Sequence, residues 1–312
     1  MSQHVTVDVS RWVVTAYEQM GSKAGKVWLE APAGGPIESG RWLFKARTTQ
    51  SERGRQFPKG DDWAEKIAGE VAVRLNIPAA PVELAVRDGE QGTISRDISR
   101  GQTLVLGNEV LFGQDPDYDR RRRRSVPGYT VEAVLSALRA LGTSAPAGET
   151  RRDACSVFVG YLLLDALVAN TDRHHENWGV LVASDDRVPP ELAATFDHAS
   201  SLGFQLSPEE RHERLNARDT RRSLEAYAMR GRSRHFAGSP SLVDLAEAGL
   251  RLCPAAVRND YQERLESLGQ EALDEMVAAI PEDRLPYEAG RFSIKLVEAN
   301  RRRLLDGLDH GS

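Results

Sequence analysis

Short apolar runs rich in β-branched and aromatic residues recur through the first hundred positions. Such runs favour strands, because branched and aromatic side chains pack well on a pleated, half-buried surface. An Asp-Gly pair at 88–89 is typical of a tight hairpin turn between two of them. We predict strands at residues 11–17, 26–31, 41–46, 81–86 and 92–98.

A segment with the periodicity of a helix lies between the third and fourth predicted strands. After a polar stretch at 47–60, which predicts a loop, apolar residues at every fourth position from Trp63 to Leu75 mark one face of a helix. Asp61 or Asp62 is placed to cap its start, and a proline follows its end.

The second part of the chain has a mostly helical pattern. Thr130 and Asp153 are placed to cap helices, and the second of these is the apolar stretch 154–169, which is short for a membrane span. Two short strands, at 178–183 and 191–196, interrupt the helices. Further helices are expected around residues 223–230, 241–252, 254–268, 271–280 and 293–308.

This order of elements predicts an α+β chain. A β-rich part followed by a helical part favours two lobes with a cleft between them. We place the β-rich N-lobe at residues 1–107 and the helical C-lobe, with its short hairpin, at residues 108–312.

Composition excludes several classes of protein. The 312 residues carry a net charge of -5 with a pI of about 5.9, so no overall basic field is present to attract nucleic acid. Cys155 and Cys253 are too few for a disulfide framework or a CxxC zinc site. With no apolar signal core at the N-terminus, we expect a cytoplasmic protein.

The most informative stretch is NTDRHHEN, residues 170–177, between the buried helix and the two short strands. Asp172 and Asn177 lie five residues apart, and the hairpin returns Asp197 to the neighbourhood of Asn177. Kinase catalytic loops use Asp and Asn at this spacing, followed by a second Asp. We therefore predict that Asp172 is catalytic and that Asn177 and Asp197 are oxygen ligands of Mg²⁺.

The two histidines of this loop allow a second interpretation. His174 and His175, together with Asp172 and Asp197, are the ligand types of a metal-dependent phosphoesterase. Adjacent side chains in a loop point in different directions, so we favour histidines that hold the loop in shape. Asp165, in the buried helix, needs a polar partner and is expected to brace the same loop.

A cation and a small-residue loop complete a candidate nucleotide site. Lys45 ends an apolar strand, where it can reach the α- and β-phosphates of ATP. Glu70 on the following helix is its expected partner, and an ion pair between Glu70 and Lys66 is the alternative. The sequence MGSKAGK can cover phosphates with its backbone N–H groups. The candidate phosphate-binding residues there are Gly21, Ser22 and Gly25.

The run Arg120–Arg124 is the one low-complexity segment. We expect a solvated loop, since a block of like charges repels itself. It is also the only segment through which we expect an acidic partner or nucleic acid to bind.

Taken together, these residues resemble the HipA-like kinases. The resemblance rests on the 170–177 loop, Asp197 in TFDHASS, Lys45 in LFK, the helical stretch 63–80, and LVLGNEVLFG at 104–113 as a link between lobes. It covers roughly residues 10 to 210. It implies a bilobal protein-kinase-like fold and Mg-ATP-dependent phosphorylation of Ser or Thr, with Ser22 as a candidate autophosphorylation site. The DRHxxN pattern also resembles phosphoinositide kinases, which keeps lipid and small-molecule acceptors open.

The expected cofactors are ATP and Mg²⁺. The expected partners are a hydroxyl acceptor on a protein or small molecule and a regulatory protein, with no membrane. A nucleotide-sensing pseudokinase is the remaining alternative, because DHA at 197–199 stands where kinases have DFG.

Overall fold

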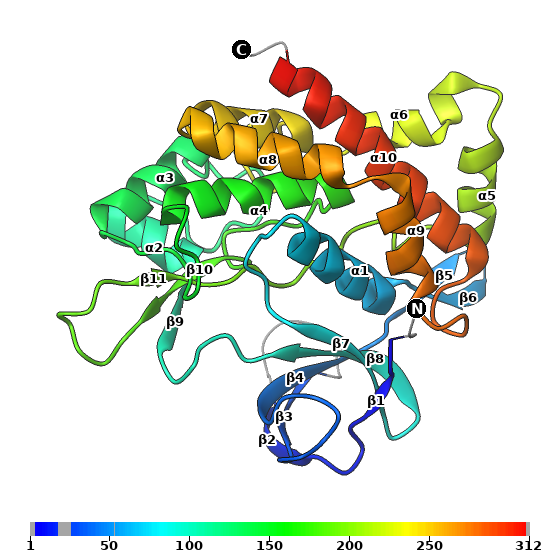
Figure 1. The fold of residues 1–312 in the computed structure, drawn as a ribbon, viewed down its shortest axis with the longest axis horizontal. Coiled ribbons are helices and arrows are strands. Elements are labelled where there is room, and N and C mark those ends of the chain that lie inside the picture. The colour runs from blue at the N-terminus through cyan, green and yellow to red at the C-terminus, as the bar shows by residue number, and fades with distance from the viewer. Residues whose placement is uncertain (1–3, 18–25, 53, 310–312) are drawn as a thin grey trace.

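A six-stranded sheet forms the N-terminal part of the molecule (Figure 1). The computed structural model describes residues 4–17, 26–52 and 54–309. Neighbouring strands run antiparallel, except that the first strand lies parallel to its partner. In spatial order the strands are β1 (Val7–Asp8), β7 (Val82–Arg87), β8 (Glu90–Arg96), β4 (Gly40–Ala46), β3 (Lys26–Ala31) and β2 (Val13–Tyr17).

Apolar and polar side chains alternate along the strands, so the two faces of the sheet differ. Trp42 and Phe44 of β4 point into a small apolar core, which they share with Leu29 of β3 and Ile94 of β8. Lys45 lies on the opposite face, because successive side chains of a strand alternate. The period-two pattern therefore places this lysine on the side that faces the rest of the molecule.

Helix α1 (Asp61–Arg74) lies between the sheet and the C-terminal helices (Figure 1). Its predicted apolar face is buried, and it belongs to one core with Leu84 of β7 and with the C-terminal helices. The predicted Asp cap is wrong. Gly60 occupies the cap position, Asp61 accepts hydrogen bonds from Thr48, and Asp62 forms an ion pair with Arg284.

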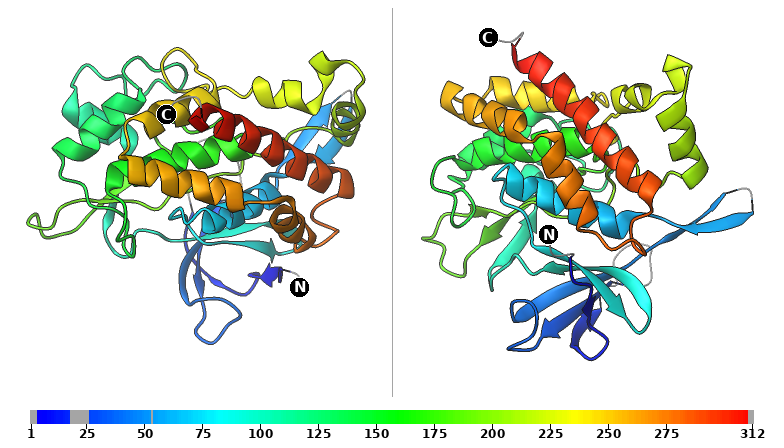
Figure 2. Two further views of the ribbon diagram at one scale, coloured as in Figure 1. Left: turned by 45° about the horizontal axis from the view of Figure 1, so that its top comes forward. Right: turned by 45° about the vertical axis from the view of Figure 1, so that its right-hand side comes forward.

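The polar stretch at 47–60 is not simply a loop. It forms a separate two-stranded ribbon of β5 (Thr49–Glu52) and β6 (Arg55–Pro58), seen at the right of Figure 2. Most of its described side chains are exposed, so no apolar alternation marks these strands in the sequence.

The C-terminal part is built around α4 (Ala154–Val168), all of whose residues are buried. Asp153 caps α4 and Thr130 caps α3 (Val131–Ala140), as predicted. The predicted helices are present, and α2 and α5 are two helices that were not predicted. Besides α3 and α4, the helices of this part are α2 (Gly107–Gln114), α5 (Pro208–Asn216), α6 (Leu224–Met229), α7 (Leu242–Arg251), α8 (Ala255–Ser267), α9 (Gln270–Ala278) and α10 (Tyr287–Asp309).

A three-stranded sheet supports the candidate site. β10 (Gly179–Val182) pairs with β11 (Glu191–Leu192) on one side and with β9 (Thr103–Leu106) on the other. The predicted strand at 191–196 is shorter than expected, since β11 ends at Leu192. The stretch at 104–113 is thus a strand followed by α2.

This architecture confirms the predicted α+β class, with a β-rich N-terminal region and a helical C-terminal region. The lobe limits 1–107 and 108–312 stay a prediction. No helix in the described part of the chain is long and apolar enough to cross a membrane.

Candidate active site

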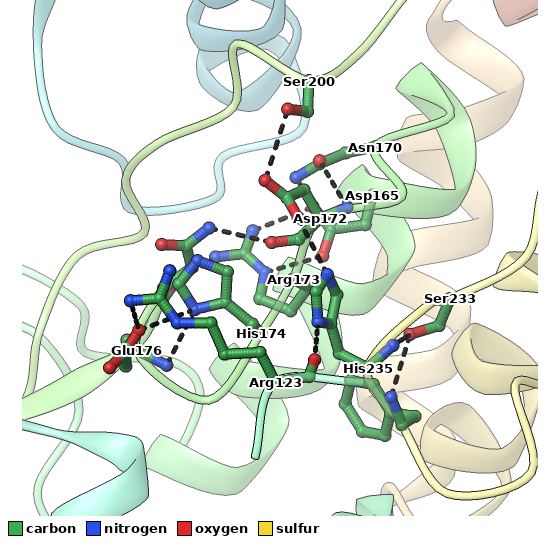
Figure 3. A network of polar contacts seen from close by, with 12 residues as sticks. Arg123, Asp165, Asn170, Asp172, Arg173, His174, Glu176, Ser200, Ser233 and His235 are labelled. Carbon is green, nitrogen blue, oxygen red and sulfur yellow. Dashed lines mark hydrogen bonds and ion pairs between the residues drawn. The ribbon is translucent and has the colours of Figure 1, made fainter. Parts of the chain in front are cut away.

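A buried ion pair fixes the loop at 170–177 (Figure 3). Helix α4 stops at Ala169, whose φ of 55° turns the chain out of the helix. Both carboxylate oxygens of Asp165 accept hydrogen bonds from the Arg173 guanidinium, at 2.7 and 2.8 Å, and one also accepts from the Asn170 amide at 2.8 Å. Arg173 in turn donates to the backbone oxygen of Asn177 at 2.6 Å. The bracing role predicted for Asp165 is therefore confirmed.

Asp172 is held from two sides. One carboxylate oxygen lies 2.8 Å from Nε2 of His235, and the other accepts a hydrogen bond from the Ser200 hydroxyl at 3.4 Å. Burial raises the pKa of Asp172, but the hydrogen bond from His235 and the nearby charges of His174 and His235 outweigh it and lower the pKa overall. The Asp172 side chain is 44% exposed, so an acceptor molecule can reach it.

His235 was not predicted from the sequence. It lies in the segment between α6 and α7, 63 residues from Asp172, and belongs to no motif or period that could have marked it. Its Nδ1 contacts the backbone oxygen of Arg123. Both ring nitrogens thus face oxygen atoms, and these two contacts fix the orientation of the imidazole.

The arginine run at 120–124 is tied to this site, which corrects the expectation of a purely solvated loop. Besides the contact with His235, the Arg123 guanidinium pairs with Glu176 of the loop at 170–177, at 2.6 Å. The backbone N–H of Ser125 donates to the oxygen of Arg234 at 2.9 Å. The arginine side chains are largely exposed, but the backbone of the run is anchored.

Lys45 joins the sheet to the candidate metal ligand. Its ammonium lies 3.0 Å from Asp197 and 3.9 Å from Glu65 of α1. Lys45, against the opposing effect of burial and with help from Lys26, holds the pKa of Asp197 well below its usual range. Asp197 has a φ of 61°, a conformation that Asp tolerates better than most residues.

The predicted pair between Lys45 and Glu70 is wrong. Glu70 pairs with Lys66 at 2.9 Å, which was the alternative interpretation. Glu65 and Glu70 are five residues apart, so they point about 140° away from each other around the helix. Glu65 faces β4 and also accepts a hydrogen bond from the backbone N–H of His198 at 3.0 Å.

Asn177 lies beside Asp172. Its side-chain N–H donates to the backbone oxygen of Asp172 at 2.8 Å. Among the residues that the structure describes, none donates to the Asn177 side-chain oxygen, which therefore fits a hard cation such as Mg²⁺ together with the Asp197 carboxylate.

The histidines of the loop have structural partners, which opposes the phosphoesterase interpretation. His175 is buried, and its Nδ1 lies 2.7 Å from the hydroxyl of Tyr118. His174 accepts a hydrogen bond from the backbone N–H of Glu176 at 3.2 Å. Within the described residues no three His, Cys, Asp or Glu side chains are grouped to bind a metal ion.

Two cavities lie beside the sheet. One of about 150 Å³ is lined by Lys26, Lys45, Glu65 and Asp197, among others. A larger one of about 560 Å³ lies near Arg41, at the far end of β4, and none of the predicted site residues lines it. The remaining predicted residues, Gly21, Ser22 and Gly25, are outside the described residues.

Comparisons with known proteins support this arrangement at the level of the fold. No protein-family model matches the sequence, and no curated protein matches it. The structure of the Helicobacter pylori proinflammatory kinase CtkA superposes with a TM-score of 0.71 over 98% of both chains, at 15% sequence identity. HipA of Shewanella oneidensis, solved with HipB and operator DNA, superposes with a TM-score of 0.59 at 12% identity. That match covers 96% of this chain and 69% of HipA.

The chain has a HipA-like kinase fold. The resemblance seen in the sequence covers roughly residues 10 to 210, with weaker support from the C-terminal helices, whereas the structural matches cover 96–98% of the chain. The sequence identities are too low to transfer activity, so the roles of individual residues rest on the geometry described above.

Proposed function

We propose that this HipA-like kinase fold is a Mg-ATP-dependent phosphotransferase that transfers the γ-phosphate to a Ser or Thr hydroxyl of a protein. The observation that carries the proposal is the 3.0 Å ion pair between Lys45 and Asp197, which joins the sheet to the segment after the hairpin. A phosphate-binding cation and a metal-binding carboxylate must converge in this way for phosphoryl transfer. The name of the structural neighbour CtkA, a kinase, agrees with this function.

The side chains that we propose to bind the nucleotide contact one another in the structure. The Lys45 ammonium contacts Asp197 and Glu65, so its side chain is already directed into the cavity of about 150 Å³. Lys26 lies opposite Lys45 in the strand register and adds a second positive charge near Asp197. The side-chain oxygens of Asp197 and Asn177 would hold Mg²⁺, which neutralises charge on the transferred phosphate when bound.

Asp172 would serve the acceptor end. Its lowered pKa keeps the carboxylate ionised at neutral pH and makes it a weak base. Its main contribution is therefore to accept a hydrogen bond from the acceptor hydroxyl and aim the oxygen at phosphorus, and the loose transition state of phosphoryl transfer requires little more from a base.

Calorimetric titration of ATP, with and without Mg²⁺, tests the nucleotide site. Wild type is expected to bind ATP more tightly with Mg²⁺, and Asp197→Ala is expected to lose that dependence. Asp185→Ala, which removes an exposed carboxylate paired with Arg187, is the matched control. Mg²⁺-dependent binding that is unchanged in Asp197→Ala would contradict the assignment. ATP binding that does not lead to phosphate transfer would favour the nucleotide-sensing alternative.

A further inference from the structure

A third cavity, of about 230 Å³, opens beside the candidate catalytic aspartate. Thr171 and Ser200 line it, and each is linked to Asp172: Thr171 precedes it in the chain, and the Ser200 hydroxyl donates to its carboxylate at 3.4 Å. An acceptor bound in this cavity would lie next to the carboxylate that orients its hydroxyl. Its other lining residues are Ala169, Gly203, Gln205, Arg214, Tyr227, Arg230, Gly231 and Arg234.

The cavity is strongly positive. Arg214 of α5, Arg230 and Arg234 line it, and no aspartate or glutamate is among the residues that do. Within the described part of the chain, none of these three arginines forms an ion pair, whereas nearby Arg221 and Arg222 pair with carboxylates at 3.1 and 3.0 Å. Guanidinium groups gathered without an ion-pair partner repel one another, and a bound anion would relieve that repulsion.

The contacts of Arg214 direct its guanidinium without neutralising it. Its charged carbon lies 4.9 Å from the ring centre of Tyr227, which also lines the cavity. Its Nε is buried and has no hydrogen-bond partner. Arg230 is fixed differently, by donating to the backbone oxygen of Arg221 at 2.8 Å. Neither contact neutralises the positive charge of the guanidinium, so both arginines can still bind an anion.

The positive surface continues outward. A neighbouring cavity of about 240 Å³ shares Arg214 and Arg230 and adds Arg222. Glu210 and Glu213 also line it, and Glu213 pairs with Arg222. The charge is therefore least compensated next to Asp172. Because Arg214 and Arg230 line both cavities, the cavities are adjacent, and such a surface suits an extended chain better than a compact small molecule.

We propose that this arginine cavity selects acceptor serines or threonines that have acidic residues close to them in a peptide segment. This inference rests on the proposed phosphotransferase function. Arginine can bind a carboxylate with two parallel hydrogen bonds, which gives direction as well as charge. A Glu or Asp side chain fits a space of about 230 Å³, and binding it there places the neighbouring hydroxyl at Asp172.

Fluorescence anisotropy with the full chain measures the binding step alone. The probes are a labelled peptide with one serine followed by glutamates and a matched peptide with glutamines instead. The glutamate peptide is expected to bind about tenfold more tightly at low salt, and the difference should shrink as salt is added. Equal affinity of the two peptides would overturn the proposal.

Substitution of single arginines locates the effect. Arg234→Gln is expected to reduce the preference for glutamate by about three- to tenfold, because one charge-assisted contact is lost. Arg234 is exposed, so its replacement should leave the core intact. Arg218→Gln is the matched control, since Arg218 is exposed and lines neither cavity. An equal loss of glutamate preference in both variants would show that the preference comes from the overall positive charge of the surface. That result would contradict the proposal.

Transfer of phosphate separates this inference from the function on which it rests. With Mg-ATP, kcat/KM is expected to be higher for the glutamate peptide, and Arg234→Gln should lower that ratio. Equal phosphorylation of both peptides would preserve the kinase function and overturn the acidic selectivity. Selective binding of the glutamate peptide without phosphorylation would preserve the acidic selectivity and contradict the kinase function. An RNA oligonucleotide that displaces the glutamate peptide from wild type but not from Arg234→Gln would assign the cavity to another class of ligand.

Discussion

Nε2 of His235 lies 2.8 Å from a carboxylate oxygen of Asp172, although 63 residues separate the two in the chain. The other ring nitrogen contacts the backbone of Arg123, so the imidazole is held at both ends. His235 therefore links the arginine run at 120–124, the segment before α7 and the loop at 170–177.

His235 is expected to act as a positioning residue for Asp172. In His235→Gln we expect the rate of phosphate transfer to fall about ten- to hundredfold while ATP affinity is retained, because only the orientation and charge of Asp172 change. The hydrogen bond from His235 lowers the pKa of Asp172, so the acid limb of the pH–rate profile should move to higher pH in the variant. His212→Gln, at an exposed histidine, is the control. An unshifted acid limb would leave His235 with a purely structural role.

The two glutamates of α1 give a direct comparison. Glu65→Gln removes a buried charge 3.9 Å from the Lys45 ammonium and is expected to raise KM for ATP about tenfold. Glu70→Gln should leave KM within about twofold, since Glu70 pairs with Lys66 instead. Steady-state kinetics on both variants measures these KM values. A larger increase in KM in Glu70→Gln than in Glu65→Gln would restore Glu70 as the partner of Lys45.

The buried ion pair of Asp165 and Arg173 should contribute more than any exposed pair to the stability of the loop at 170–177. Arg173→Met leaves the Asp165 carboxylate buried without its main partner and is expected to lower the free energy of unfolding by about 3–5 kcal/mol. Arg187→Met, at an exposed pair, should cause no measurable change. Urea denaturation of the two variants tests this, and similar effects at both sites would show that the buried pair is not special.

His175 should make the fold sensitive to acid. Burial lowers its pKa from 6.5 to about 4, so between these values the unfolded chain binds the proton more readily than the folded chain. Stability from this group is present above about pH 6.5 and is lost as pH falls toward 4. His175→Gln should remove that part of the pH dependence, as measured by denaturation at several pH values. If the free energy of unfolding depends on pH in the same way in wild type and variant, His175 does not contribute to acid sensitivity.

Much of the fold follows from local patterns in the sequence. Strand alternation and the four-residue period of α1 mark elements whose faces are buried, and capping residues such as Thr130 mark helix starts. The ribbon of β5 and β6 escaped prediction because one face is exposed and the described residues of the other, Gln50 and Phe57, are only partly buried, which leaves no apolar period to detect.

Residues of the candidate site could be predicted from the sequence only where they lie close together in the chain or are joined by a short hairpin. Asp172 and Asn177 share one loop at a fixed spacing, and the hairpin brings Asp197 back to them. The choice between Glu65 and Glu70 depends on the rotation of α1 against β4, and the contact of His235 depends on how distant segments pack. Such information is spread over the whole tertiary structure and leaves no short motif.

We propose that Asp172 orients an acceptor hydroxyl for transfer of phosphate from Mg-ATP. The most direct measurement is single-turnover formation of ADP and phosphopeptide from Mg-ATP and the glutamate peptide, with wild type and Asp172→Asn compared. We predict that the variant binds Mg-ATP normally but forms phosphopeptide about a thousandfold more slowly. Phosphopeptide formation at the wild-type rate in Asp172→Asn would contradict the account.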